Sequence, residues 1–403
     1  MSIKDQTAIV GVGATPLYKR GQSYPAESEL TLACKAILAA LDDAGLTVQD
    51  LDGFALYSHA FEPAEVGAML GMPEVRFTAT ITGGGGASGG SVGLAAAAIH
   101  AGMATCVVTC MTVQQANRRL GGSAVPSGQG SALTYGSAGL GIASPYAGFT
   151  TNSGLLGPGH AAGVIAGRHM AQFGTRREAF AEVAISSRDN ATRNPDAIMR
   201  SPLTLDDYMS SRMINEPLCL YDFTLETDGA VAVITVSADR AKDLRHPPVY
   251  IMGSAHGGIG RTGPLNWKWF QMTDEHLVSS GSRMAAQRMY EMAGIGPDDV
   301  DVAMIYDNFA PNVVMQLEDY GFAPRGEGGP FVEDGNLRWK TGSLPVNTDG
   351  GNLSHGYVIG MTHVAEAVAQ LRGTAVNQVD GAEVALVTGG TSLLPMSGTQ
   401  LRR

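Results

Sequence analysis

Residues 83–111 have the sequence GGGGASGGSVGLAAAAIHAGMATCVVTCM. The four glycines, Gly83 to Gly86, predict a place where the backbone approaches another group closely. The small residues from Ala87 to Ala101 predict a tightly packed helix, and Ala104 to Met111 has the composition of a buried strand. This succession of glycine-rich turn, helix and buried strand indicates an α/β protein.

The alternation of strands and helices continues along the first half of the chain. The apolar pattern predicts strands at Thr7–Gly13, Leu51–Tyr57, Arg76–Thr82 and Ala230–Ser237, and a helix over Glu27–Gly45. Residues 112–225 break this rhythm, with loops and two expected helices, 163–173 and 176–192. We interpret this stretch as an inserted cap or loop region.

The second half repeats the order of the first. It predicts strands at Val249–Ser254, Val300–Tyr306 and Glu383–Thr388, and helices at His276–Ala293, Asn312–Gly321 and Tyr357–Leu371. Two similar halves predict a duplicated domain, residues 1–245 with the insertion and residues 246–403. Periodicity alone leaves one long doubly wound sheet as an alternative.

Composition and charge exclude several classes of protein. The net charge is -11 and no long basic run is present, so nucleic acid is not an expected partner. The most apolar stretch, Val92–His100, is about half of the roughly 20 residues that span a bilayer. The start of the chain lacks the apolar segment of a signal peptide. We therefore expect a cytoplasmic enzyme.

The cysteines do not suggest a metal site or disulfides. Cys34, Cys106, Cys110 and Cys219 form no CxxC pair and have no histidine at metal-ligand spacing. We expect the cysteines to be small core residues of a protein in a reducing compartment. We expect no metal or cofactor in this chain.

Several short segments resemble motifs of one enzyme family. They are His169-Met170-Ala171-Gln172-Phe173-Gly174-Thr175, Arg193-Asn194-Pro195, Ser201-Pro202-Leu203-Thr204, Pro217-Leu218-Cys219-Leu220-Tyr221-Asp222, Thr227-Asp228-Gly229-Ala230, Tyr306-Asp307-Asn308-Phe309, Val346-Asn347, Gly350-Gly351 and Gly356-Tyr357-Val358-Ile359-Gly360. In this order they resemble the HM..YGT, NP, PIT, PLR..D….SDGA, HDCF or NEAF and VNP.GG….GHPLG segments of sterol-carrier-protein-type thiolases. The resemblance covers most of the chain. It implies the thiolase fold, a layered α/β sandwich of two βαβαβαββ units around two buried helices, and a homodimer.

The chain departs from this family at its catalytic positions. The family's NNNCATGS segment corresponds to residues 83–90 here, so Gly86 stands where the nucleophilic cysteine would be. Tyr357 replaces the histidine of GHPLG, and Tyr306 replaces the residue that opens NEAF or HDCF. The segment around Gly390 lacks the family's second cysteine. Without a cysteine at a helix start, no acyl-enzyme can form there.

The two changes to tyrosine predict a replaced mechanism. A lone tyrosine at a strand end is usually a core residue with a hydrated hydroxyl. Two phenols at two catalytic positions of one pocket instead indicate acid–base roles. We expect Tyr357 at a helix start, where the dipole favours a partly ionised phenol. Ser88 is a weaker candidate nucleophile, and capping the helix is its alternative role.

Further residues are of second rank. Asp307 either lines the pocket or, more simply, holds loop amides. His355 either orients Tyr357 or has a surface or capping role. His256 and Gly390 are expected near the pocket, although a histidine between glycines is also common in loops.

Retro-aldol cleavage fits this set of residues. Cleavage of a β-hydroxyacyl-CoA forms the enolate that thiolases stabilise, but it needs no acyl-enzyme. The combination resembles the thiolase-like aldolases of bacterial steroid side-chain degradation. That resemblance implies a steroid acyl-CoA substrate, a ketone and a short acyl-CoA such as propionyl-CoA as products, and a small zinc-ribbon/OB-fold partner that would bring any zinc.

Two alternatives stay open on the sequence. One is a cysteine-independent acyltransferase or thiolase variant, and the other is a non-catalytic lipid carrier or scaffold. The sequence does not determine the acyl chain, the stereochemistry, or which tyrosine is the base.

Overall fold

The computed structural model describes residues 1–403 except 1, 21, 23–26, 58–60, 82–83, 116–153, 155–157, 259–277, 280 and 391–395. The strands are β1 (Thr7–Ala14), β2 (Tyr18–Lys19), β3 (Gly53–Tyr57), β4 (Phe77–Ile81), β5 (Cys106–Val113), β6 (Met213–Asn215), β7 (Leu218–Cys219), β8 (Thr227–Ser237), β9 (Val249–Gly257), β10 (Val302–Met304), β11 (Val384–Gly389) and β12 (Met396–Arg402). The helices are α1 (Glu29–Ala44), α2 (Pro63–Leu70), α3 (Ser88–His100), α5 (Pro158–Phe173), α6 (Arg177–Arg193), α7 (Leu205–Met209), α8 (Ala238–Ala241), α10 (Arg283–Ala293), α11 (Ala310–Asp319), α12 (Gly328–Glu333) and α13 (Met361–Arg372).

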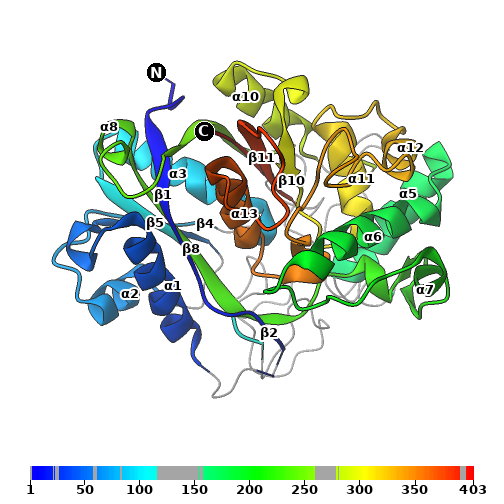
Figure 1. Ribbon diagram of the computed structural model, residues 1–403, viewed down its shortest axis with the longest axis horizontal. Helices are drawn as coiled ribbons and strands as arrows, with labels where there is room; N and C mark the ends of the chain where they lie inside the picture. Colours follow the sequence, from blue (N-terminus) through cyan, green and yellow to red (C-terminus); the bar gives the residue numbers. More distant parts are fainter. Residues whose placement is uncertain are drawn as a thin grey trace.

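The main sheet has two halves with the same strand arrangement (Figure 1). In the first half, β1 and β5 flank β8 and run antiparallel to it, and β3 and β4 continue in parallel beyond β5. In the second half, β9 and β11 flank β12 antiparallel, and β10 continues in parallel. A parallel bridge between Ala303 and Val346 takes the place that β4 has in the first half. The duplicated α/β fold predicted from the sequence is therefore confirmed.

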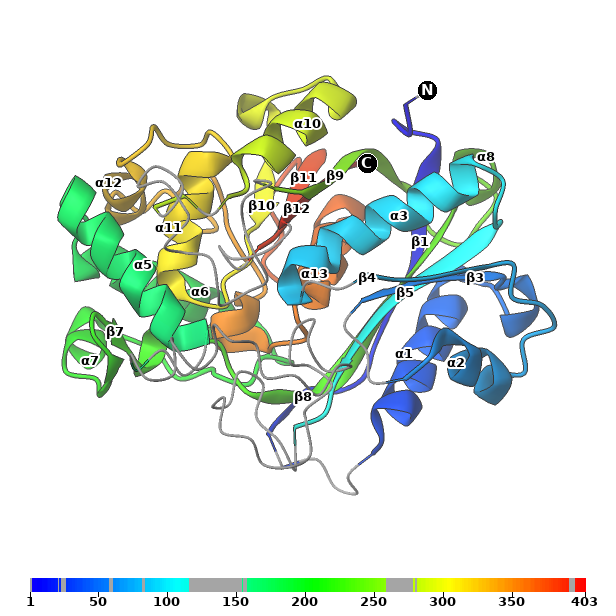
Figure 2. The same cartoon turned by 180° about the vertical axis from the view of Figure 1, so that it is seen from behind.

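The two halves join where β1 pairs with β9, through Ala8 opposite Tyr250 and Ile9 opposite Val249. The expected division at residues 245/246 falls between α8 and β9. Helices α3 and α13 contact strands of both halves and lie side by side at the centre, as Figure 2 shows from behind. Helices α1 and α10 pack on the outer faces. Strands β5 and β8 are buried along their length because helices cover both of their faces.

The composition of α3 explains its central place. Small residues let it approach the sheet closely, and Gly93 shows this most directly. A Cβ atom on Gly93 would lie 2.2 Å from the Oγ atom of Ser254 in β9. A larger side chain at this position would push the helix away from the sheet.

Three helix starts predicted from the sequence are wrong. Helix α5 begins at Pro158, five residues before the expected start at residue 163. Helix α10 begins at Arg283, because Val278 and Ser279 form a turn and Gly281 has a φ of 78°. His276, the expected start, lies outside the described residues. Helix α13 begins at Met361, not at Tyr357, because Ile359 and Gly360 have φ values of 47° and 86°. Tyr357 therefore lies in a loop.

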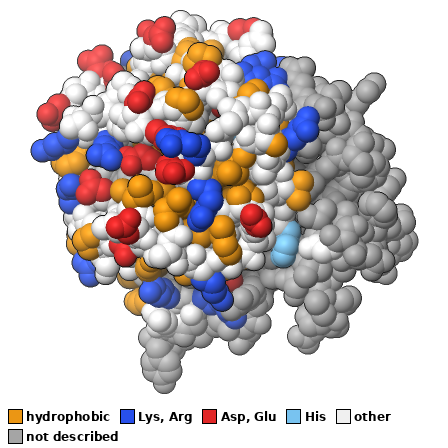
Figure 3. All heavy atoms as spheres, turned by 90° about the vertical axis from the view of Figure 1, so that its right-hand side faces the viewer, with side chains coloured by type: hydrophobic (Ala, Val, Ile, Leu, Met, Phe, Trp, Pro, Cys, Tyr) orange, Lys and Arg blue, Asp and Glu red, His pale blue; other side chains and the backbone are white. Residues whose placement is uncertain are grey.

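The inserted region 112–225 contributes α5, α6, α7 and the β6–β7 hairpin, with residues 116–153 and 155–157 outside the described part. On this side of the molecule, acidic and basic side chains alternate with apolar ones (Figure 3). Among the described residues, no helix is long and apolar enough to cross a membrane.

Candidate active site

Tyr306 and Tyr357 meet in the interior of the protein. Their hydroxyl oxygens are 2.7 Å apart, and either hydroxyl can donate the hydrogen bond. Tyr306 lies two residues after the end of β10, and Tyr357 lies in the loop before α13. Both side chains are buried, and their ring planes are tilted by 59°. The fold therefore joins the two phenols that the sequence singled out.

Glycines make the space for the Tyr306 ring. A Cβ atom on Gly85 would lie 1.9 Å from Cζ of Tyr306, and one on Gly360 would lie 2.9 Å from its Cε2. Gly86 is buried in the same short turn, Gly84–Ala87, just before α3. Ser88 donates a hydrogen bond to the Gly85 carbonyl at 3.0 Å, which is a local role in the turn. The glycine-rich start of α3 thus accommodates a phenol and offers no nucleophile at Gly86.

A third tyrosine supports the loop that carries Tyr357. The hydroxyl of Tyr57, at the end of β3, donates to the carbonyl of Ile359 at 2.9 Å. Burial raises the pKa of the Tyr57 phenol well above its usual value, and the neighbouring Cys110 and Tyr357 add to this. Tyr57 therefore stays protonated and remains a donor to the strained Ile359 peptide.

Asp307 holds the turn that precedes Tyr357. Its carboxylate accepts hydrogen bonds from the backbone amides of Asn352 at 2.9 Å and Leu353 at 3.2 Å. It also lies 3.1 Å from Nε2 of His363, and both side chains are fully buried. The ring of His363 meets that of Tyr306 edge to face, with centroids 6.3 Å apart. Asp307 thus has the amide-holding role that the sequence offered as the simpler one.

His355 belongs to a separate polar cluster. Its Nδ1 lies 2.5 Å from the Asp349 carboxylate. Burial lowers the pKa of His355, but the Asp349 carboxylate outweighs burial and the pKa is raised. Burial first, and then the Asp349 charge, raises the pKa of Glu366 in α13 to about 7. His355 is therefore occupied by Asp349, although it lies two residues from Tyr357.

His256 and Gly390 take less central places. His256 is exposed at the end of β9, and a Cβ on Gly90 in α3 would lie 2.7 Å from its Cγ. Gly390 follows β11, where a Cβ would lie 2.8 Å from Sδ of Met396 and 3.8 Å from Oε1 of Gln316. Gly390 therefore lies near Gln316, whose side chain donates a hydrogen bond to the Tyr306 carbonyl. His256 lies against the first turn of α3.

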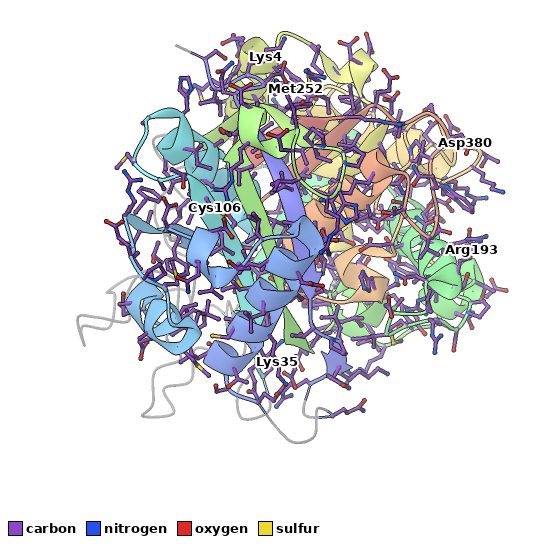
Figure 4. The ribbon with its side chains drawn as sticks, turned by 60° about the vertical axis from the view of Figure 1, so that its left-hand side comes forward. Lys4, Lys35, Cys106, Arg193, Met252 and Asp380 are labelled. Carbon is purple, nitrogen blue, oxygen red and sulfur yellow. The ribbon has the colours of Figure 1, made fainter. Side chains whose placement is uncertain are left out.

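All four cysteines are buried free thiols. Burial raises the pKa of Cys106 to about 12 and that of Cys110 further still. Figure 4 shows Cys106 among the packed elements, whereas Lys35, Arg193 and Asp380 lie at the periphery. The described part of the chain contains no group of three or more histidine, cysteine or acidic side chains that could hold a metal ion.

Comparison with known proteins shows to which family this chain belongs. The family described as "Thiolase C-terminal domain-like" matches residues 265–401. A steroid side-chain-cleaving aldolase of Thermomonospora curvata is 39% identical, over 97% of this chain and 96% of the relative. The chain belongs to the thiolase-like aldolases. A second relative of the chain is the 17-hydroxy-3-oxo-4-pregnene-20-carboxyl-CoA lyase of Mycobacterium tuberculosis. It is 36% identical to this chain, over 98% of this chain and 99% of the lyase.

Solved structures agree with this assignment. The structure of an "Ltp2-ChsH2(DUF35) aldolase" superposes with a TM-score of 0.88 at 35% identity, over 100% of this chain and 99% of that one. Human mitochondrial 3-ketoacyl-CoA thiolase has a TM-score of 0.71 at 16% identity, over 100% of this chain and 99% of that one. The second likeness shows the shared thiolase fold alone.

Sequence reasoning missed the residues that support the two tyrosines of this aldolase. These are Tyr57, Thr227, Gln316 and Thr388, all buried and all hydrogen-bonded to the tyrosine segments. Strand and helix patterns treat such residues as ordinary core positions. The threonine that opens the Thr227-Asp228-Gly229-Ala230 motif was the one available signal.

Proposed function

We propose that the chain cleaves the bond between the α and β carbons of a β-hydroxy steroid acyl-CoA by a retro-aldol reaction. The observation that carries this proposal is the pair of hydroxyls of Tyr306 and Tyr357, 2.7 Å apart, beside a helix start that carries the glycines Gly85 and Gly86. Such a site has groups for proton transfer but no thiol to accept an acyl group.

The reaction divides into two proton transfers. A base removes the proton of the β-hydroxyl, the carbon–carbon bond breaks, and its electron pair moves into the thioester as an enolate. The β-carbon becomes a ketone, and an acid then protonates the α-carbon of the enolate. Protons and electrons balance without water or an oxidant. Two hydrogen-bonded phenols suit both steps, because a proton taken up by one can pass to the other.

The steroid substrate is the finer part of the proposal. The relative from Mycobacterium tuberculosis is named for 17-hydroxy-3-oxo-4-pregnene-20-carboxyl-CoA. With that substrate, cleavage beside the hydroxylated ring carbon would give a steroid ring ketone and propionyl-CoA. A related β-hydroxy steroid acyl-CoA with another side-chain length would react by the same steps.

We further propose a homodimer that works with a small zinc-ribbon/OB-fold protein. The similar two-component aldolase structure supports a partner. Strand β4 supports self-association, because it ends the sheet and its described backbone pairing is with β3 alone. Any zinc would then belong to the partner. A cytoplasmic location is also part of the proposal, and the four buried free thiols support a reducing compartment.

The test is direct cleavage with purified components. The chain, alone and co-expressed with a zinc-ribbon/OB-fold partner, is incubated with 17-hydroxy-3-oxo-4-pregnene-20-carboxyl-CoA, and mass spectrometry follows propionyl-CoA and the steroid ketone. We expect equal amounts of both products. Binding without products, even with the partner, would support a carrier or scaffold. A condensed product or a covalent acyl-protein would support an acyltransferase.

Light scattering and metal analysis test the assembly. We expect the mass of a dimer for the isolated chain and zinc only in samples that contain the partner. A monomer at micromolar concentration would contradict the proposed dimer, and stoichiometric zinc in the isolated chain would contradict the placement of zinc in the partner.

A further inference from the structure

We infer that two buried threonines, Thr227 and Thr388, are positioning residues that set the distance between the hydroxyls of Tyr306 and Tyr357. This inference rests on the proposed function, because it assigns a role in the same site. Each threonine holds the backbone of one tyrosine through a hydroxyl that both accepts and donates a hydrogen bond.

Thr227 holds Tyr357 on both sides of its α-carbon. The backbone N–H of Tyr357 donates to Oγ1 of Thr227 at 3.1 Å, and the same hydroxyl donates to the carbonyl of Tyr357 at 2.6 Å. Thr227 is the first residue of β8 and is fully buried. The anchor of the Tyr357 loop is therefore a strand of the first half of the sheet.

Thr388 holds Tyr306 through a closed ring of three hydrogen bonds. The backbone N–H of Tyr306 donates to Oγ1 of Thr388 at 2.9 Å, and this hydroxyl donates to Oε1 of Gln316 at 2.6 Å. Nε2 of Gln316 donates back to the carbonyl of Tyr306 at 2.7 Å. Thr388 lies in β11 and Gln316 in α11, and both are fully buried.

The position of the tyrosines explains why these contacts are needed. Tyr306 follows the end of β10 and Tyr357 precedes α13, so neither has the backbone partners of a strand interior or a helix. Buried N–H and C=O groups without partners are costly, and here the side chains of Thr227, Thr388 and Gln316 supply the missing bonds. The threonine hydroxyls bond to the backbone of the tyrosines and not to their phenols. The two tyrosine hydroxyls contact one another.

The two supports come from different halves of the protein. Thr227 belongs to the first half and Thr388 to the second, yet they fix two residues whose hydroxyls are 2.7 Å apart. The separation of the phenols thus depends on how the halves pack. A displacement of about 1 Å at a reacting group can cost about 10²-fold in rate.

Thr→Val substitutions test this role, because valine keeps the shape of threonine and removes the hydroxyl. For Thr227→Val and Thr388→Val we expect kcat to fall about 10- to 100-fold, with KM nearly unchanged. Thr227→Ser and Thr388→Ser retain the hydroxyl and should restore most of the lost kcat. Thr235→Val is the matched control, because Thr235 is buried in β8 and its hydroxyl has no hydrogen-bond partner among the described residues.

A double-mutant cycle separates positioning from general stability. In a Tyr357→Phe background, Thr227→Val should cause little further loss, because its effect acts through the Tyr357 hydroxyl. If a valine variant is recovered unfolded, the Thr→Ala variant at the same position takes its place and is compared with the Thr→Ser variant. Valine or alanine variants with the kcat of the Thr235→Val control, or serine variants no better than valine, would overturn the inference. Absence of cleavage by the wild-type complex would instead overturn the proposed function.

Discussion

The start of α3 and the loop before α13 border the same interior space but contribute to it in opposite ways. The turn Gly84–Ala87 contributes backbone and room, and it contains Gly86, the residue predicted to stand at the cysteine position of thiolases. The loop Gly356–Gly360 contributes the phenol of Tyr357, held by Thr227 and, through Ile359, by Tyr57. One region consists of residues with almost no side chain, while the other places a phenol in the interior.

The contact between Gly85 and Tyr306 explains why these two features belong together. A Cβ atom on Gly85 would lie 2.0 Å from the Tyr306 hydroxyl oxygen. The phenol therefore occupies space that a side chain at Gly85 would fill, so the glycine turn and the tyrosine pair are parts of one arrangement. A thiolase fold can change its chemistry by such an exchange of volume between two regions.

Removal of the tyrosine hydroxyls tests the reactive region with the largest expected effect. Tyr306→Phe and Tyr357→Phe should each lower kcat by about 10²- to 10⁴-fold, because each removes one acid–base group and keeps the ring. Steady-state assays of the steroid acyl-CoA cleavage measure this. Tyr290→Phe is the control, since the Tyr290 hydroxyl in α10 donates to the Tyr320 carbonyl at the end of α11. Near-normal turnover in both active-site variants would exclude the assignment.

Filling the glycine turn is the second test. Gly85→Ala should displace the Tyr306 ring, lower kcat by about 10²-fold, and lower stability by about 1–3 kcal/mol through overpacking. Activity assays and thermal unfolding report the two effects. Gly167→Ala in α5 is the control, because a Cβ there meets nothing within 4 Å. A fully active Gly85→Ala protein would show that the turn and the phenol do not share volume as described.

The third prediction concerns the cluster beside the Tyr357 loop. Glu366 has a pKa raised from 4.5 to about 7, first by burial and then by Asp349. Between these values the folded protein binds more protons than the unfolded chain, so its stability falls as the pH rises. His355 acts in the same direction, because its raised pKa gives a stabilising contribution that is lost at higher pH.

Glu366→Gln should remove most of this pH dependence. Glutamine resembles the protonated acid, so the variant should match the wild type most closely near pH 4, below the unfolded pKa, and be more stable at pH 8 by up to about 3 kcal/mol. Urea unfolding at both pH values, at one protein concentration, measures the difference. Glu291→Gln, at an exposed position in α10, controls for loss of a surface charge. The same stability difference at both pH values would refute the role of Glu366.

The smallest expected effect is the absence of thiolase activity. With acetoacetyl-CoA and CoA, the wild type should form no acetyl-CoA above background, because Gly86 has no nucleophilic side chain. Intact-mass measurement should likewise find no acyl adduct. An acyl-protein would show that another residue, with Ser88 as the first candidate, replaces the cysteine.

Much of the fold followed from local patterns. The continuous apolar run of β8 and the helical spacing of α1 were recognisable, since burial on the sheet and helix periodicity act over a few residues. Strand β12 escaped prediction because Ser397, Gly398, Thr399 and Gln400 carry no apolar pattern. Its burial comes from pairing with β9 and β11, which lie far from it in the sequence.

The sequence by itself determined the family resemblance and the identities of Gly86, Tyr306 and Tyr357, from which a lost cysteine and two catalytic tyrosines are predicted, because these depend on residue identity in ordered motifs. Only the tertiary structure decided that Tyr357 lies in a loop, that His355 pairs with Asp349, and that threonines from two halves bond to the backbone of the two tyrosines. Thr388 and Tyr306 lie 82 positions apart in the sequence, and the loop with Tyr357 contains positive φ angles at Ile359 and Gly360. Neither long-range contact nor local backbone strain leaves a periodic trace in a single sequence.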